Sequence, residues 1–202
     1  TPPKTQSALL EAMQEGSVTA SGNTYRLPKP FFVLATQNPI EQEGTYPLPE
    51  AQLDRFMFNV WVDYPSYEEE LEIVKKTTSD ESTNLEVILT AEQIIAYQDL
   101  IRRIPVADNV LEYAVSLVNK TRVKNEKATE LTQKYITWGA GPRASQYLIV
   151  GAKCYAALRG KYSPDIEDVK AIAKPILRHR LVRNYRADAE GYSMDRIIEE
   201  LL

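Results

Sequence analysis

The sequence is poor in cysteine and histidine. Cys154 is the only cysteine among 202 residues, so no disulfide can form within the chain. We expect this cysteine to pack as a small apolar group on a helix face, without a reactive role. His179 is the only histidine. That count argues against a histidine-based metal site and against a catalytic triad.

Long apolar runs and a strong net charge are also missing. No run approaches the roughly 20 residues that cross a bilayer, and no signal peptide is recognisable, so a cytoplasmic protein is expected. Lys and Arg number 24 against 28 Asp and Glu, which gives a net charge of −4. A chain with this net charge produces no overall positive electrostatic potential that would attract a polyanion. Nucleic acid is therefore disfavoured as a partner, and a DNA-associated motor is disfavoured as a function.

The glycine-rich loop that cradles phosphates in many nucleotide-binding proteins is absent. None of the eight glycines lies in a GxxxxGK[ST] pattern; Gly160-Lys161 comes nearest, but Tyr162 follows it. An apolar strand ending in Asp-Glu, which would bind a metal ion, is missing as well. Val60-Trp61-Val62-Asp63 imitates it, but Tyr64 follows where an acidic partner is needed.

Two nearby segments carry the most informative residues. Residues 31–36 form an apolar run of strand length, followed by Asn38 and by a proline that cannot continue a ladder. The run predicts a buried strand with Asn38 at its carboxyl end, where open α/β sheets hold their ligands. Residues 49–55 predict a short helix that ends in Asp54-Arg55 and leads into a second apolar strand, 56–62. An arginine at that junction is expected to point outward, within reach of a neighbouring subunit.

Helical periodicity dominates after Val62, and a domain boundary near residue 64 is the natural prediction. Before it we expect a helix closed by Gly16 and a hairpin with strands near 18–19 and 25–27. After it the expected helices are 67–78, one capped by Thr90, one capped by Asp108, one from Pro142 to Gly160 with Tyr147, Gly151, Cys154 and Leu158 inward, one from Asp165, and 194–202. Pro175 is expected either to break the helix from Asp165 or to begin a new turn. The polar stretch 122–133 predicts a loop.

Together with Gly141-Pro142-Arg143-Ala144, these motifs resemble the AAA+ ATPases, and specifically the MoxR family. The resemblance covers nearly the whole chain. It implies an α/β plus all-α fold: residues 1–63 as the distal part of a P-loop NTPase α/β domain and residues 64–202 as a helical lid bundle. The chain therefore looks like the back portion of a longer ATPase, from which Walker A and Walker B are missing.

The resemblance also implies roles for single residues. It makes Asn38 the sensor 1 residue and Arg55 the arginine finger, both catalytic, and Arg143 the sensor 2 residue that contacts the nucleotide. It places the hairpin near 18–27 toward the central pore of a ring, although a surface hairpin without contacts accounts for the same residues. No residue is assigned to a metal.

At the level of the whole protein, the resemblance implies ATP hydrolysis with Mg²⁺ in a ring, expected to be a hexamer. The implied activity is chaperone-like protein remodelling, often beside proteins with a von Willebrand factor A domain. The alternative is a binding or assembly module without hydrolysis. In either case we predict that this chain alone does not bind ATP with useful affinity, because the phosphate loop is absent.

Each site residue also has a plainer interpretation. Asn38 fits an Asn-Pro turn that ends a strand, and Arg55 fits a salt bridge with Asp54 or another carboxylate. Arg143 lies in the first turn of its helix, where a cation opposes the helix dipole. An anion held in front of the helix explains it, and a nearby carboxylate serves almost as well.

The one basic cluster lies near the carboxyl end of the chain and comprises Arg178, His179, Arg180, Arg183 and Arg186. Phosphate or nucleic acid is a possible ligand for such a cluster. Helical spacing spreads the residues around the axis, however, so we expect a solvated face or salt bridges between helices.

Overall fold

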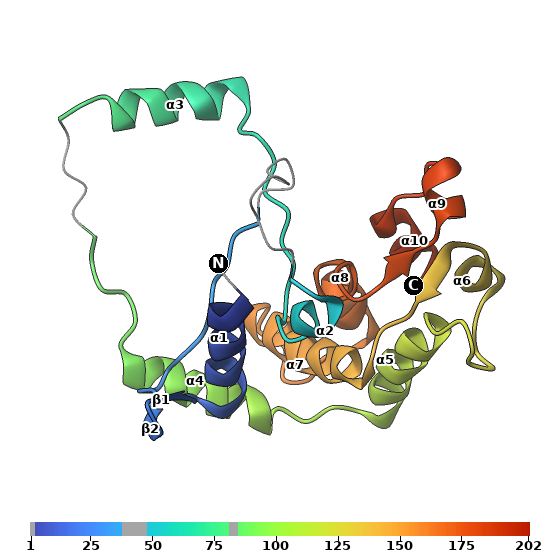
Figure 1. Cartoon of the computed structure of the whole chain (residues 1–202), viewed down its shortest axis with the longest axis horizontal. Coiled ribbons are helices and arrows are strands. Elements are labelled where there is room, and N and C mark those ends of the chain that lie inside the picture. Colours follow the sequence, from blue (N-terminus) through green and yellow to red (C-terminus); the bar gives the residue numbers. More distant parts are fainter. Residues whose placement is uncertain (1–2, 38–47, 81–84) are drawn as a thin grey trace.

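The computed structural model describes residues 3–37, 48–80 and 85–202 of the chain (Figure 1). Its helices and strands are, in chain order, α1 (Pro3–Glu15), β1 (Ser17–Ala20), β2 (Asn23–Arg26), α2 (Glu50–Leu53), α3 (Tyr67–Thr77), α4 (Ala91–Arg103), α5 (Asp108–Lys120), α6 (Glu130–Tyr135), β3 (Ile136–Trp138), α7 (Pro142–Leu158), α8 (Ile166–Leu177), β4 (Val182–Arg183), α9 (Tyr185–Ala189) and α10 (Met194–Leu201).

The helices begin where the sequence carries capping signals. Capping boxes open α3 at Ser66, α4 at Thr90 and α8 at Asp165, because each cap side chain accepts from a backbone amide that has no partner within the helix. Pro142 opens α7, where the missing N–H costs nothing. These starts confirm the predicted helices. Asp108 differs from its prediction: it is the first residue inside α5, and Ala107 takes the cap position without a side-chain hydrogen bond.

The core of the molecule lies between α5, α7, α8 and α10. Gly151 lets α7 approach α8 closely, since a Cβ there would lie 3.2 Å from Ile172 Cδ1 and 3.3 Å from Ile176 Cδ1. The fully buried aliphatic side chains of this core are Leu117, Val118, Leu148, Val169, Ile176, Leu177, Ile197 and Ile198. Their burial is the main term that stabilises this part of the chain.

Two small antiparallel ladders are present. β1 pairs with β2 in the register Ser17 to Arg26 and Ala20 to Asn23, which confirms the predicted hairpin. Gly16 ends α1 in the left-handed conformation, with φ of 61°, and its carbonyl accepts from Leu27 N at 2.8 Å. β3 pairs with β4, two strands that the sequence analysis did not predict.

The prediction of strands at 31–36 and 56–62 is wrong, because neither segment forms a strand with any described residue. Neither segment pairs with another strand, and neither is buried: the Leu34 and Val62 side chains are 87% and 91% exposed. An apolar run becomes a strand only when a neighbouring strand satisfies its backbone amides and carbonyls. No such neighbour lies beside either run in the described part of the chain.

Three helix details also differ from prediction. Residues 130–133, expected in a loop, belong to α6, which Thr129 caps. Pro175 lies inside α8 and does not break it, because Ile176 and Leu177 beyond it are fully buried and this burial outweighs one missing hydrogen bond.

The third difference concerns the inward face of α7. Cys154 is exposed and Leu158 is 83% exposed, so these two predicted inward positions are wrong, whereas Gly151 is buried and Tyr147 packs against the core as predicted. The buried face consists of mostly small residues: Ala144, Leu148, Gly151, Ala152 and Ala156. Small side chains were decisive because they allow the close approach of α8.

Helix α3 has no buried residue and stands apart from the compact part of the molecule (Figure 1). The compact helical part begins with α4, which packs against α7. In the described residues, no helix combines the length and the apolar character that crossing a bilayer requires.

Candidate functional site

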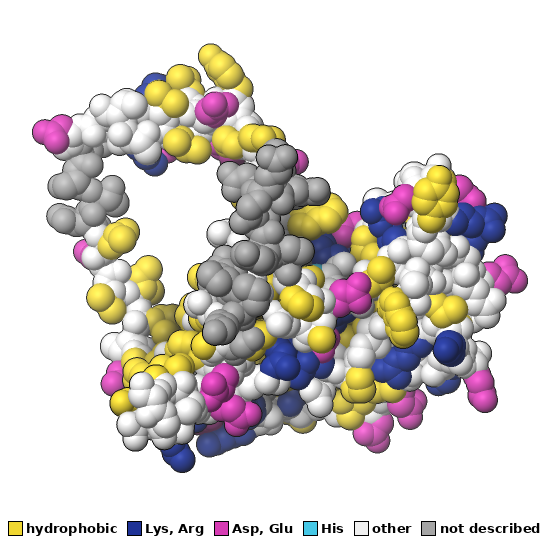
Figure 2. Space-filling model, in the orientation of Figure 1, with side chains coloured by type: hydrophobic (Ala, Val, Ile, Leu, Met, Phe, Trp, Pro, Cys, Tyr) yellow, Lys and Arg dark blue, Asp and Glu magenta, His cyan; other side chains and the backbone are white. Residues whose placement is uncertain are grey.

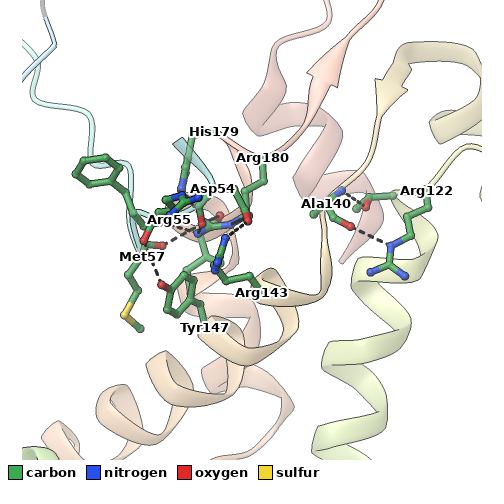
Figure 3. A network of polar contacts seen from close by, with 12 residues as sticks. Asp54, Arg55, Met57, Arg122, Ala140, Arg143, Tyr147, His179 and Arg180 are labelled. Atoms are coloured by element: carbon green, nitrogen blue, oxygen red, sulfur yellow. Dashed lines mark hydrogen bonds and ion pairs between the residues drawn. The ribbon is translucent and has the colours of Figure 1, made fainter. Parts of the chain in front are cut away.

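A single carboxylate joins the segment after α2 to the helical part of the molecule. Asp54 Oδ2 accepts from Arg143 Nη1 at 2.6 Å, and Asp54 Oδ1 accepts from Arg180 Nε at 3.0 Å (Figure 3). Arg143 comes from the first turn of α7, and Arg180 lies just beyond the end of α8. One negative charge is thus shared between two guanidinium groups from different helices.

Arg180 is the buried anchor of this arrangement, with a side chain that is 1% exposed. Besides the Asp54 carboxylate, its guanidinium donates to the backbone carbonyls of Asp54, Phe56, Met57 and Ile176. Burial lowers the pKa of Arg180, and Asp54 acts in the opposite direction. These carbonyls and the carboxylate replace the water that the buried charge has lost.

Other side chains of α7 and of the α8 end hold the same segment by its backbone. Tyr147 Oη donates to the Arg55 carbonyl at 3.1 Å, and Arg178 Nη1 donates to the Asn59 carbonyl at 3.3 Å. The Asn59 amide donates to the Pro175 carbonyl at 2.8 Å. We call residues 54–59 the docked segment, because its backbone is fixed by the helical part although it forms no strand.

His179 completes the contact from the α8 end. Its Nε2 lies 3.0 Å from the Phe56 carbonyl oxygen and 2.7 Å from Arg180 Nη1. Nδ1 is buried and makes no hydrogen bond within the described part of the chain. Burial, together with the charge of Arg180, lowers the pKa of His179 to about 4, so the ring is neutral at pH 7.

The position of Arg143 is fixed by the loop that precedes α7. Thr121 Oγ1 accepts from the Ala140 amide at 3.0 Å, and Arg122 Nε donates to the Ala140 carbonyl at 2.9 Å (Figure 3). Gly139 is required for this contact, since a Cβ would lie 2.2 Å from the Thr121 carbonyl oxygen. The end of α5 therefore places the first turn of α7.

That first turn leaves donors available for an anion. Gly141 caps α7 without a side-chain hydrogen bond, and the space around its Cα is open. Among contacts to described residues, Nη1 is the one Arg143 donor that is used, and the side chain is 36% exposed. The geometry therefore accommodates a phosphate beside Arg143, with Asp54 as a nearby negative charge that the phosphate must tolerate.

Arg55 occupies a different environment. Its side chain is half-buried, whereas the sequence predicted that it points outward. Its Nε is buried and makes no hydrogen bond to the described residues. A surface hollow of about 350 Å³ lies beside it, lined by Leu10, Glu11, Gln14 and Glu15 of α1. The alternative that Arg55 pairs with Asp54 is not observed, because Asp54 is engaged by Arg143 and Arg180.

The three predicted site residues thus fare differently. Asn38 lies outside the described residues. Arg143 has a nearby carboxylate, that of Asp54, as its plainer interpretation required. Arg55 lies next to Asp54 in the chain, and the structure places its backbone, not its guanidinium, in contact with α7.

Sequence reasoning missed Asp54 and Arg180 as parts of the site. The basic cluster 178–186 was the available signal. Of its two predicted outcomes, a solvated face is wrong for Arg180, which is buried, whereas a salt bridge is present in its contact with Asp54. Arg178 confirms the expected salt bridges between helices, because it binds Asp195 of α10 with two hydrogen bonds, of 3.1 and 2.7 Å. The spacing of these residues along the helix gave no indication that Arg180 binds backbone carbonyls.

Two protein-family models match this chain, one near its amino-terminal end and one near its carboxyl-terminal end. The family model described as "ATPase family associated with various cellular activities (AAA)" matches residues 1–58, and the model of the AAA lid domain matches residues 128–201. Chaperone MoxR1 of Mycobacterium tuberculosis is 41% identical over 207 residues, which include the whole of this chain and 53% of the relative. Protein MoxR of Paracoccus denitrificans is 27% identical, over 89% of this chain and 56% of the relative.

The chain belongs to the MoxR family of AAA+ ATPases.

Two further relatives extend this result. YeaC of Bacillus subtilis, an uncharacterized protein, is 41% identical over the whole of this chain and 61% of the relative. The crystal structure of a Cytophaga hutchinsonii protein provisionally assigned as an ATPase superposes with a TM-score of 0.91 at 41% identity, over 99% of this chain and 61% of that one. The fold of the MoxR-family chain is therefore AAA+ ATPase-like with a helical lid, and the chain spans a little over half the length of its relatives.

A metal ion has no evident ligands here. Among the described residues, no group of three or more His, Cys, Asp or Glu side chains is placed to hold one. The Arg143 guanidinium is a kind of group that binds phosphate, whereas the described residues supply no cluster of carboxylates for a metal ion.

Proposed function

We propose that the full-length protein hydrolyses ATP in a ring of AAA+ subunits and uses the energy for chaperone-like protein remodelling. The observation that carries the proposal is the placement of Arg143. It stands at an uncapped helix start with donors free for an anion, and its orientation is set by Asp54. Family membership and the relative named as a chaperone support the wider function.

Three residues of this chain have roles in the proposed reaction. Arg143 binds the terminal phosphate of ATP and offsets its charge. Asn38 holds the attacking water through its amide, which needs hydrogen bonds and no titration. Arg55 reaches the nucleotide of a neighbouring subunit and stabilises the charge that develops on the transferred phosphoryl group. These roles follow from the motif match, residue by residue.

The remaining parts of the proposal come from the family. The ring is proposed to be a hexamer, with Mg²⁺ accompanying ATP and with von Willebrand factor A-domain proteins as partners in the cytoplasm. The α/β part is proposed to comprise residues 1–63 and the helical lid residues 64–202, and the match of the AAA lid model to residues 128–201 supports the second assignment. The hairpin β1–β2 is proposed to face the central pore.

A second candidate function is an assembly or binding module without hydrolysis. It is favoured for the isolated chain by one observation: no GxxxxGK[ST] pattern occurs in the 202 residues. The backbone nest and the lysine that hold ATP phosphates are therefore missing. Calorimetry of the isolated chain with ATP and magnesium tests this candidate, and we expect no submillimolar binding. Submillimolar binding contradicts it.

The hydrolytic function is tested with Arg55→Ala in the full-length protein. An arginine finger contributes roughly 10³ to 10⁵ in rate, so we expect turnover to fall by at least 10³ while the melting temperature stays unchanged. Arg186→Ala is the matched control: this arginine forms an i,i+4 pair with Glu190, and its side chain is 60% exposed. Full turnover of Arg55→Ala contradicts the proposal.

A mixing experiment tests whether Arg55 acts between subunits. Asn38→Ala and Arg55→Ala subunits are each expected to be inactive alone. In mixed rings, an Asn38→Ala subunit presents its intact Arg55 to the intact site of an Arg55→Ala subunit. Activity should therefore recover in the mixture, and its absence would show that Arg55 serves its own subunit.

A further inference from the structure

Two neighbouring residues of the docked segment are held by two neighbouring turns of one helix. The Asp54 carboxylate binds Arg143 at 2.6 Å, and the Arg55 carbonyl accepts from Tyr147 at 3.1 Å. Arg143 and Tyr147 are four residues apart on α7 and so lie on the same helix face. The Arg143 guanidinium, proposed above to bind a phosphate, and the backbone that carries Arg55 are therefore attached to the same rigid element.

We propose that Asp54 is a positioning residue that couples the phosphate contact of Arg143 to the placement of Arg55. This inference rests on the proposed function, in which Arg143 and Arg55 both act on nucleotide. Asp54 touches neither substrate nor reacting atoms. It acts through the two arginines that it orients and through the peptide bond that it shares with Arg55.

The carboxylate is suited to this role because its two oxygens serve different partners. Oδ1 is held by Arg180, which is buried and bound to four backbone carbonyls, so this side of the contact is fixed. Oδ2 holds Arg143 by Nη1, and no other described residue binds that guanidinium, so among these residues its other edge is available to an anion. Asp54 therefore orients Arg143 without using up its donors.

Movement is transmitted because no free linker separates the two contacts. A phosphate that draws Arg143 changes its hydrogen bond with Asp54, and residue 54 is bonded directly to residue 55. The hydrogen bond of Tyr147 prevents the Arg55 backbone from relaxing independently of α7. Whether nucleotide is bound beside Arg143 would in this way change the position of Arg55, which is proposed to contact the nucleotide of the next subunit.

The test uses full-length protein and hydrogen exchange of the peptide that covers residues 50–58. In the wild type, magnesium with the slowly hydrolysed analogue ATPγS should change the exchange of this peptide. Asp54→Asn should remove at least four-fifths of that change. Asp168→Asn is the matched control, because Asp168 is a buried carboxylate shared between Lys161 and Arg159 on the opposite end of α8.

Steady-state kinetics supply a second measurement. Asp54→Asn should lower kcat at least tenfold and change KM less than threefold, and Asp54→Glu should restore part of kcat. In an Arg143→Gln background, the further loss caused by Asp54→Asn should be less than twofold, because the coupling is already broken. Measurements are made below the melting temperature of every variant, since the loss of Asp54 leaves Arg180 without its carboxylate.

Three outcomes separate the two proposals. If the wild type hydrolyses ATP and Arg55→Ala is inactive, but Asp54→Asn keeps both kcat and the exchange response, the coupling is refuted and the function stands. If the effects of Asp54→Asn and Arg143→Gln multiply, Asp54 is only structural and the coupling is again refuted. If the wild type does not hydrolyse ATP, the proposed function itself fails.

Discussion

Asp54, Arg180 and His179 show how single residues can fix a backbone that has no secondary structure of its own. The charged partners are extensively buried, and each buried charge is offset by an opposite charge or by carbonyl oxygens. Removing one partner of such a pair costs about 3 to 5 kcal/mol, because the other charge stays buried and uncompensated. Specific polar contacts therefore hold the backbone of this site in place.

His179 makes the stability of this contact depend on pH. Burial and the charge of Arg180 together lower its pKa to about 4, from about 6.5 in the unfolded chain. The unfolded chain therefore binds more protons between these values, and stability falls as the pH falls from about 6.5 to about 4. Because the ring is partly accessible, we expect a loss of roughly 1 kcal/mol between pH 7 and pH 5.

The measurement compares urea unfolding of the wild type and of His179→Gln at pH 7 and pH 5. Other groups titrate in both proteins, so the difference between the two losses isolates the histidine. We expect the wild type to lose more stability than the variant. An equal loss in both would show that the ring titrates normally.

At the scale of elements, glycine decides how closely two pieces of backbone approach. Gly139 lets the loop before α7 lie against the carbonyl of Thr121 at the end of α5, and Gly151 lets α7 lie against α8. A side chain at either position requires a shift of its neighbours. At Gly139 that neighbour is backbone, which yields less readily than a side-chain methyl group.

We therefore predict that Gly139→Ala destabilises the chain by at least about 2 kcal/mol, because the new Cβ would overlap the Thr121 carbonyl. Gly141→Ala is the control two residues further on. A Cβ there meets nothing within 4 Å, and the φ of −77° suits any residue, so we expect a loss below about 1 kcal/mol. Chemical denaturation measures both, and equal losses would contradict the packing argument.

At the scale of the molecule, apolar side chains are distributed unevenly. Figure 2 shows hydrophobic side chains on the visible surface, including the region around α3 and α4. Phe32, Leu34, Val60 and Val62 are all exposed, and within the described ranges their segments have neither a strand partner nor a covering helix. Exposed apolar chain with free backbone groups promotes association with other copies.

We predict that the isolated chain self-associates at micromolar concentrations, as measured by sedimentation velocity over a concentration series. The double substitution Leu34→Glu with Val62→Glu should shift the distribution toward monomer. Leu158→Glu is the control, because Leu158 is equally exposed but lies at the end of α7 in the compact part. A chain that remains monomeric throughout the series would refute the prediction.

The sequence alone was sufficient for features that depend on neighbouring residues. Capping residues and proline mark the starts of α3, α4, α7 and α8, and Gly16 marks the end of α1. The motifs around Arg55 and Arg143 were also sufficient for the family. The contacts that set a helix end, and the residues that make up each motif, lie within a few positions of one another in the chain. They can therefore be recognised from the order of residues.

Only the tertiary structure decided the features that depend on distant partners. Residues 31–36 and 56–62 are strand-like in composition, yet a ladder needs a neighbour, and none is present among the described residues. The partners of Asp54 lie 89 and 126 residues further along the chain, at Arg143 and Arg180. Nothing local encodes these contacts, because they arise only when α7 and α8 pack and bring both arginines to the same carboxylate.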